Sequence, residues 1–290
     1  MIHDFRRKIV IGYEGKFPEG DLVELIVRIK PFGIIFFSRN FASPAELKNI
    51  IAAFRDIDSG LEFLIDQEGG EKCRIFGEPY CPPQPWSMRD LPPVEIRRHF
   101  RDSAEALAEL GITINLAPVA DLGTGDYIRR RTFGTDPQAV AERVLAAVEG
   151  ITAGGLAPCV KHFPGLGAAQ FDPHKTLPIS NIPLEEYIEK HWVPFAAAIS
   201  AGVPYIMTTH IIATAIDRKN PATYSSLILN ELEKLGFSGQ VFSDDLAEMK
   251  GAHIFSPQER IKKALSAGHD VVLWCNISDF PLESIIPSVY

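Results

Sequence analysis

Two short clusters of polar residues in this sequence combine side chains that can do nucleophilic and acid–base chemistry. The first is the run 161–167, with the sequence KHFPGLG, which is followed by Asp172 and His174. The second is the run 243–246, SDDL. Both come directly after a short apolar run, which is where catalytic groups gather in barrel enzymes. The sequence therefore predicts one active site that contains both clusters.

The residue types in these clusters suit cleavage of a glycosidic bond. That reaction needs a carboxylate against the anomeric carbon and a proton donor near the leaving oxygen. We expect Asp244 to be the nucleophile. The donor is usually a carboxylic acid, but His174 is an alternative, because the unperturbed pKa of histidine, about 6.5, lies near working pH. Asp172 would hold that imidazole in one tautomer, and Pro173 would limit how the pair moves.

Eight short apolar runs, rich in β-branched residues, alternate with amphipathic segments and would position these groups. Such near-continuous apolar character is typical of parallel strands covered on both faces. The expected strands are 9–13, 33–37, 62–65, 113–117, 157–160, 205–208, 240–242 and 270–273. Eight strands interleaved with helices predict a (β/α)8 TIM-type barrel that forms a single domain over residues 1–290, because closure leaves no edge strand. An open doubly wound sheet is the alternative, but no GxGxxG motif follows the first strand.

The expected helices have recognisable starts. Ser43 and Ser256 are each followed by proline and, three residues on, by glutamate, a combination that favours a capped first turn. The further helical segments are 21–30, 95–110, 137–153, 184–201 and 226–235.

Other polar residues also follow the expected strands. Closure of the barrel would bring them to one mouth, because all parallel strands end on the same side. They are Asp66, Gln67, Glu68, Asp121, Lys161, His162, Thr209, His210, Asp244 and Asp245.

Composition excludes several classes of partner. The chain is 46% hydrophobic and 23% charged, with a net charge of −8. An acidic chain lacks the electropositive field that neutralises phosphates, so we expect no nucleic-acid partner. No apolar stretch approaches the roughly 18 residues of a membrane span, and the N-terminal apolar run is too short for a signal peptide. We expect a cytoplasmic monomer that acts on a small carbohydrate.

The cysteines give no sign of a metal site. Cys73, Cys81, Cys159 and Cys275 show no CxxC spacing and no histidine at zinc-finger distance. The sequence therefore predicts neither a disulfide nor a structural zinc, and we expect no cofactor.

Several motifs in order resemble those of glycoside hydrolase family 3, in particular the β-N-acetylglucosaminidases of bacterial cell-wall recycling. The resemblance runs from about Ile9 to Leu273. Its motifs are DQEGG at 66–70, KHFPGLG at 161–167 with Asp172 and His174, PAT at 221–223, and FSDDL at 242–246.

The resemblance implies a retaining, two-step mechanism with a covalent glycosyl–aspartate intermediate. It assigns the nucleophile to Asp244 and the acid/base to His174, with Asp172 as its partner. The implied substrate is a terminal β-linked N-acetylglucosamine, as in GlcNAc-anhydroMurNAc muropeptides. The sugar-binding positions carry over to Asp66, Arg74, Arg131, Lys161 and His162.

Three departures from the family pattern bear on specificity. Pro173 stands where the family has serine between Asp172 and His174. Leu166 replaces a usual histidine, and the segment 247–249, AEM, is one residue longer than the common Ser-Met.

Other functions remain open on the same residues. A metal-dependent hydrolase could use His162, His174, His210 and Asp244 as zinc ligands, although the HxH expected after the first strand is missing. A phosphorylase is a second alternative, since a histidine acid/base does not repel an incoming anion. A β-glucosidase-type specificity and a non-catalytic carbohydrate-binding barrel complete the set.

Each candidate also has a purely structural interpretation. Asp244 or Asp245 could cap a helix. His174 could be a solvated loop residue, and the arginines could be solvated as well. We expect His210 to be a hydrogen-bonded core histidine.

Overall fold

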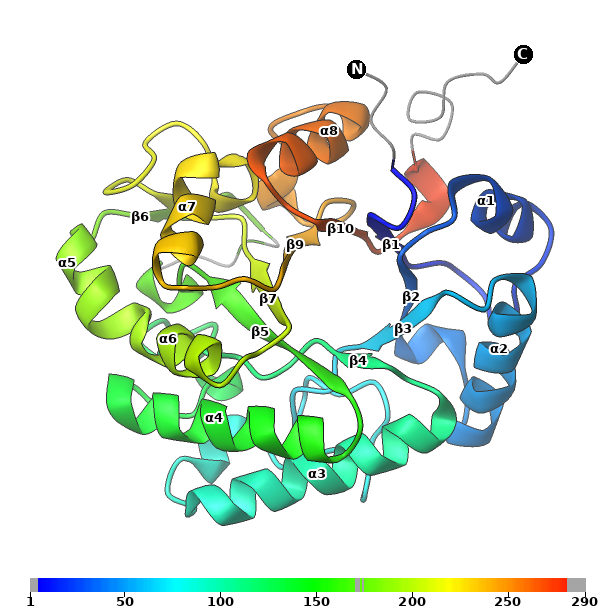
Figure 1. The fold of residues 1–290 in the computed structure, drawn as a ribbon, viewed down its shortest axis with the longest axis horizontal. Helices are drawn as coiled ribbons and strands as arrows, with labels where there is room; N and C mark the ends of the chain where they lie inside the picture. The colour runs from blue at the N-terminus through cyan, green and yellow to red at the C-terminus, as the bar shows by residue number, and fades with distance from the viewer. Residues whose placement is uncertain (1–4, 170–172, 174, 281–290) are drawn as a thin grey trace.

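The predicted barrel is confirmed by the computed structural model, which describes residues 5–169, 173 and 175–280. Eight parallel strands close in the order β1-β10-β9-β7-β5-β4-β3-β2 (Figure 1). The strands are β1 (Ile9–Ile11), β2 (Gly33–Phe36), β3 (Glu62–Ile65), β4 (Ile114–Asn115), β5 (Ala157–Phe163), β7 (Tyr205–Thr208), β9 (Gln240–Asp245) and β10 (Val271–Trp274). Each expected strand is present, although β1, β2 and β4 are shorter than predicted and β10 begins and ends one residue later.

The helices form a ring outside the barrel (Figure 1). They are α1 (Asp21–Ile29), α2 (Pro44–Ile57), α3 (Pro93–Leu110), α4 (Pro137–Ala153), α5 (Leu184–Glu186), α6 (Val193–Ser200), α7 (Ser226–Lys234) and α8 (Pro257–Ala267). The predicted starts are confirmed. Ser43 Oγ accepts a hydrogen bond from the Glu46 N–H at 3.2 Å, and Glu259 Oε2 accepts one from the Ser256 N–H, also at 3.2 Å.

The prediction of one continuous helix over 184–201 is wrong in its middle. A π-helical turn, Tyr187–His191, separates α5 from α6, and the Trp192 N–H donates to the Tyr187 carbonyl at 2.8 Å. Pro194 lies in the first turn of α6 and has no N–H to continue an α-helical ladder. The turn lets Trp192 stack on Phe163 and donate from Nε1 to the Pro164 carbonyl at 3.0 Å. The helix is thereby fixed to the end of β5.

Two strands extend further than predicted, and this matters for the site. The strand β5 includes Lys161 and His162, and β9 includes Asp244 and Asp245. A small parallel pair was missed altogether, β6 (Ile179–Ser180) with β8 (Ile212–Ala213). Its strands of two residues are too short to show a pattern in sequence.

Apolar side chains fill both faces of the barrel wall. One cluster, to which every barrel strand contributes, lies on the inner face, and a second packs the outer face against the helices. In β2, for example, Ile35 belongs to the inner cluster, whereas Ile34 and Phe36 belong to the outer one. This two-sided burial explains the unbroken apolar runs.

Helices α3 and α4 approach each other closely because α4 ends in small residues. A Cβ at Gly150 would lie 2.4 Å from the Arg97 carbonyl oxygen, and one at Gly154 would lie 2.5 Å from Ala104 Cβ. Both contacts are too short for real carbon atoms, so glycine is required for this packing.

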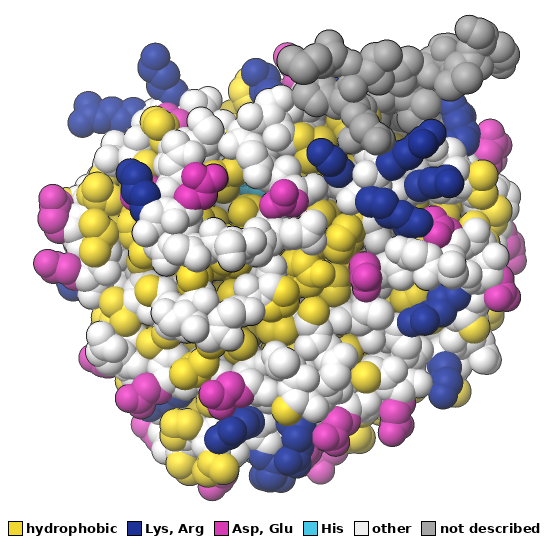
Figure 2. Space-filling model, viewed as in Figure 1, with side chains coloured by type: hydrophobic (Ala, Val, Ile, Leu, Met, Phe, Trp, Pro, Cys, Tyr) yellow, Lys and Arg dark blue, Asp and Glu magenta, His cyan; other side chains and the backbone are white. Residues whose placement is uncertain are grey.

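The exterior carries charges of both signs. Figure 2 shows Lys and Arg side chains interspersed with Asp and Glu around the rim of one face. Within the described part of the chain, no helix combines the length and the apolar character that a bilayer span needs.

Candidate active site

A pocket lies where the polar strand ends converge. Six of the eight predicted site residues line it, namely Asp66, Arg74, Arg131, Lys161, His162 and Asp244. Asp172 and His174 lie outside the described residues, but Pro173 between them in sequence lines the pocket.

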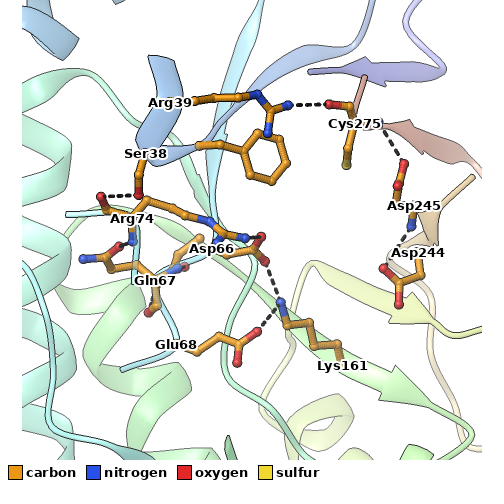
Figure 3. A network of polar contacts seen from close by, with 12 residues as sticks. Ser38, Arg39, Asp66, Gln67, Glu68, Arg74, Lys161, Asp244, Asp245 and Cys275 are labelled. Carbon is orange, nitrogen blue, oxygen red and sulfur yellow. Dashed lines mark hydrogen bonds and ion pairs between the residues drawn. The ribbon is translucent and has the colours of Figure 1, made fainter. Parts of the chain in front are cut away.

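Lys161, at the end of β5, is the centre of a buried ionic network (Figure 3). Its Nζ lies 2.7 Å from Asp66 Oδ1 and 2.7 Å from Glu68 Oε1, and its side chain is only 4% exposed. Burial by itself would lower the pKa of Lys161, but the two carboxylates outweigh burial and raise it. The ammonium is therefore charged.

The carboxylates of this network are each shared between two cations. Asp66 Oδ2 accepts from Arg74 Nη2 at 2.7 Å, and Glu68 accepts from Arg131 Nε at 2.8 Å and Nη2 at 2.7 Å. Burial opposes ionisation, yet Lys161 and Arg74 hold the pKa of Asp66 well below its usual range. Burial likewise opposes ionisation of Glu68, but Arg131 and Lys161 lower its pKa to about 2. Both groups are anionic at neutral pH.

Arg74 is also held by an aromatic face. Its guanidinium carbon lies 5.0 Å from the centroid of the Phe37 ring, and that of Arg39 lies 4.3 Å from the same centroid. Arg39 is fixed in turn by the Cys275 carbonyl oxygen at 3.0 Å (Figure 3). The loop after β2 therefore supports an arginine that comes from the loop after β3.

The hydrogen bonds of His162 fix its tautomer. Arg131 Nη2 lies 3.2 Å from Nε2, and because a guanidinium only donates, Nε2 must accept. The Nδ1–H then donates to Asp121 Oδ2 at 2.7 Å. The ring is therefore held on both sides.

Asp244 lies on the opposite wall, at the end of β9 (Figure 3). Its Oδ1 accepts from the Asp245 N–H at 2.9 Å, and its Oδ2 accepts from Thr209 Oγ1 at 3.4 Å. These contacts fix the orientation of the carboxyl group. The arrangement places a carboxyl oxygen across the pocket from the Lys161 network.

The neighbouring Asp245 has a structural role. It accepts from the backbone N–H groups of Ala247, Glu248 and Cys275 at 3.0, 2.8 and 2.8 Å. Burial raises the pKa of Asp245 although these hydrogen bonds lower it. The carboxyl joins the end of β9 to the end of β10, and it thereby fixes the backbone next to Asp244.

His210 is a buried core histidine, as expected. Its Nδ1 lies 2.7 Å from Thr223 Oγ1 and its Nε2 lies 2.8 Å from the Asp245 carbonyl oxygen. It supports the end of β9, and it is not among the residues that line the pocket.

The structure gives no support to the alternative of a zinc-dependent hydrolase in the part of the chain that it describes. Among residues 5–169, 173 and 175–280, no group of three or more His, Cys, Asp or Glu side chains could hold a metal ion. One residue proposed as a ligand, His174, lies outside these ranges.

Two residues hold the site together although the sequence analysis gave them no binding role. Glu68 joins Lys161 to Arg131, and Asp121 orients His162, yet neither was predicted as a binding residue. The signal for Glu68 was its spacing from Asp66, since residues two apart in an extended segment point to the same side. Asp121 was noted as a polar residue after the fourth strand, but its partner could not be read from the sequence.

Comparison with known proteins decides the family. The model of the glycosyl hydrolase family 3 N-terminal domain matches residues 16–289. The chain belongs to glycoside hydrolase family 3. A β-hexosaminidase of Nitrosomonas eutropha is 35% identical over 263 residues, which cover 85% of this chain and 74% of that protein.

Solved structures agree with this assignment. NagZ from Neisseria gonorrhoeae, in complex with N-trifluoroacetyl-D-glucosamine, superposes with a TM-score of 0.86 at 28% identity, over 97% of this chain and 84% of that one. A family 3 β-N-acetylglucosaminidase from Paenibacillus superposes with a TM-score of 0.89 at 30% identity. The match covers 94% of this chain but 54% of the Paenibacillus protein. The relationship makes this family 3 chain a glycosidase of the β-hexosaminidase type.

Proposed function

We propose that this family 3 chain is a retaining β-N-acetylglucosaminidase that removes terminal β-linked N-acetylglucosamine from muropeptides or related glycosides. The observation that carries the proposal is Asp244, a carboxylate on the pocket wall that faces a buried ionic network of sugar-binding character. The N-acylated glucosamine in the related NagZ structure supports the choice of sugar.

The network supplies fixed donors and acceptors for sugar hydroxyls. Asp66 accepts hydrogen bonds, while Arg74 and Lys161 donate, and the two cations are already oriented by their hydrogen bonds to Asp66. Preorganised groups lose little freedom on binding, so they hold the sugar ring in one position. We propose that Arg131 and His162 bind the same sugar from the neighbouring side.

The chemistry proceeds in two steps. Asp244 attacks the anomeric carbon while His174, as imidazolium, gives its proton to the leaving oxygen, so the glycosidic bond breaks and a glycosyl ester forms. His174, now neutral, then takes a proton from water, and the hydroxide oxygen displaces Asp244 from the anomeric carbon. Asp172 would stabilise the cationic form of the imidazole in the first step.

The Asp244→Ala variant tests the nucleophile. We expect it to abolish release of p-nitrophenol from p-nitrophenyl β-GlcNAc, whereas His174→Ala should mainly slow the protonation-dependent steps. Glu71→Gln is a matched control, because Glu71 is an exposed carboxylate paired only with the exposed Arg130 side chain among its described ion pairs. Wild-type rates in Asp244→Ala would refute the assignment.

Phosphorolysis is a second candidate, favoured by the charge of the network. Within the network three cations, Lys161, Arg74 and Arg131, meet two anions, Asp66 and Glu68. The other charged residues that line the pocket are Lys72, Asp244, Asp245 and Glu248, so the positive charge is confined to the side of the network, where an anionic acceptor would bind. Products formed with and without inorganic phosphate separate a sugar 1-phosphate from a free sugar.

Location and assembly stay predictions. We propose a cytoplasmic monomer that binds neither nucleic acid nor membranes, which cell fractionation and light scattering of the purified chain would test.

A further inference from the structure

The loop between β3 and α3 carries much of the sugar-binding network and folds back on itself. Its first part supplies Glu68 and Arg74, and its return part runs beside it. The Gly70 N–H donates to the Pro82 carbonyl at 3.0 Å, and Gln67 Nε2 donates to the Tyr80 carbonyl at 3.1 Å. The two parts of the loop therefore lie against each other.

The side chains at these two positions are thiols in contact. Cys73 and Cys81 are both free, and their side chains interact with each other. Cys73 is buried, whereas Cys81 is partly exposed, with its Sγ 3.4 Å from the Pro82 carbonyl oxygen and 3.6 Å from that of Gly70. The Cys81 thiol is thus accessible to a reagent, whereas the Cys73 thiol is shielded from solvent.

We propose that Cys73 and Cys81 form a redox-active dithiol, which a small-molecule disulfide oxidises to an intramolecular disulfide that alters sugar binding through Arg74. The oxidation does not depend on the proposed function, whereas the effect on N-acetylglucosamine binding rests on it. Reversible disulfides of this kind are known from reducing compartments, where stable structural ones are rare.

The thiol–disulfide exchange takes place in two steps. The Cys81 thiolate attacks one sulfur of glutathione disulfide, an S–S bond forms to Cys81, and one glutathione leaves as thiolate. Cys73 then loses its proton to solvent and attacks the Cys81 sulfur, which releases the second glutathione. The protein loses two hydrogen atoms and two electrons, and one glutathione disulfide becomes two glutathione molecules.

The surroundings of the two thiols fit these roles. The interaction with the Cys73 side chain lowers the pKa of Cys81, which favours the attacking thiolate. The same interaction and burial raise the pKa of Cys73, so it keeps its proton until Cys81 has reacted. Neither of the remaining cysteines resembles Cys81, because burial raises the pKa of both Cys159 and Cys275.

A disulfide at Cys73 would affect the pocket because Cys73 is next to Arg74 in the chain. Arg74 directly follows Cys73, and its N–H donates to Gln67 Oε1 at 2.8 Å. Drawing the two sulfurs to bonding distance moves the backbone at residue 73, and with it the guanidinium that binds Asp66. Asp244 lies on β9, across the pocket, and keeps its own contacts. Oxidation should therefore weaken sugar binding more than it slows the chemical step.

The test is exposure of the purified full chain to glutathione disulfide, with intact mass and peptide mapping as the first measurement. We expect a loss of about 2 Da, a Cys73–Cys81 crosslinked peptide and full reversal by dithiothreitol. Cys73→Ser should instead stop at a glutathione adduct on Cys81. Cys159→Ala, a matched control with one buried thiol removed, should still form the crosslink. A wild-type chain that acquires only glutathione adducts, or no modification, would overturn the dithiol.

The second measurement is the Kd of N-acetylglucosamine by calorimetry, which needs no turnover. The oxidised chain should bind more weakly, by a factor on the order of threefold to tenfold, since small displacements of a positioning group have effects of this size. An oxidised chain with an unchanged Kd would overturn the coupling to Arg74. Failure of the proposed function would show itself differently, as no sugar binding by the reduced chain.

Discussion

Replacement of Lys161 by methionine is the perturbation that probes the buried network most sharply. The substitution removes two contacts of 2.7 Å, to Asp66 Oδ1 and Glu68 Oε1, and leaves two carboxylates with one cation fewer. The side chains of Lys161 and Glu68 are 4% and 2% exposed, so water cannot take over the lost interaction.

The size of the effect follows from these contacts. Each charge-assisted hydrogen bond is worth about 1.5–3 kcal/mol, and Arg74 and Arg131 remain to compensate in part. We expect the free energy of unfolding at pH 7 to fall by about 3–5 kcal/mol, as when one partner of a buried pair is removed. The KM of the variant for p-nitrophenyl β-GlcNAc should rise as well.

Urea denaturation of both proteins measures this difference. Lys72→Met is the control, because Lys72 lines the same pocket but is exposed, and we expect it to change stability by less than about 0.5 kcal/mol. A Lys161→Met variant whose free energy of unfolding lies within about 1 kcal/mol of the wild-type value would contradict this expectation, since the network would then contribute little to the fold.

Three further predictions follow from the described contacts. The pKa of Glu68 is lowered from 4.5 to about 2 in the folded state, so the ionised side chain stabilises the fold above pH 4.5, and this contribution should be lost as pH falls toward 2. Urea denaturation between pH 5 and 2 measures the free energy of unfolding, and a value that does not change with pH would contradict this. Asp121→Ala leaves the His162 Nδ1–H without its acceptor, and we expect KM to rise about tenfold in a folded variant, with an unchanged KM as the contrary result. Gly154→Ala places a Cβ 2.5 Å from Ala104 Cβ, so thermal unfolding should show a loss of about 1–3 kcal/mol; a gain in Tm would mean that α3 and α4 can separate freely.

The sequence was sufficient for the barrel because its signals are local. Each strand is recognisable in the sequence as an apolar run, and Ser43 and Ser256, at the N-termini of α2 and α8, make the expected capping hydrogen bonds. The break at Tyr187–His191 also has a local cause, Pro194, but the choice of a π-turn depends on Trp192 docking against Phe163, a contact between distant segments.

The site was only partly predictable, because its side chains interact with residues that are far away in the sequence. Lys161 looked like the end of a strand because a charged residue is costly inside one. It continues β5 in the structure because Asp66 and Glu68, almost a hundred residues away in sequence, supply its counter-charges. The five predicted sugar-binding residues do line one pocket, whereas their roles, and those of Asp172, His174 and Asp244, stay predictions.

The covalent mechanism through Asp244 is tested most directly by trapping the glycosyl–enzyme intermediate with a fluorinated N-acetylglucosaminyl donor and locating the adduct by peptide mass. The anomer that the untrapped enzyme releases is followed by NMR. We expect a sugar ester on the peptide that contains Asp244, and a first-formed product that keeps the β configuration. An adduct on another residue, or a first-formed α-anomer, would contradict it.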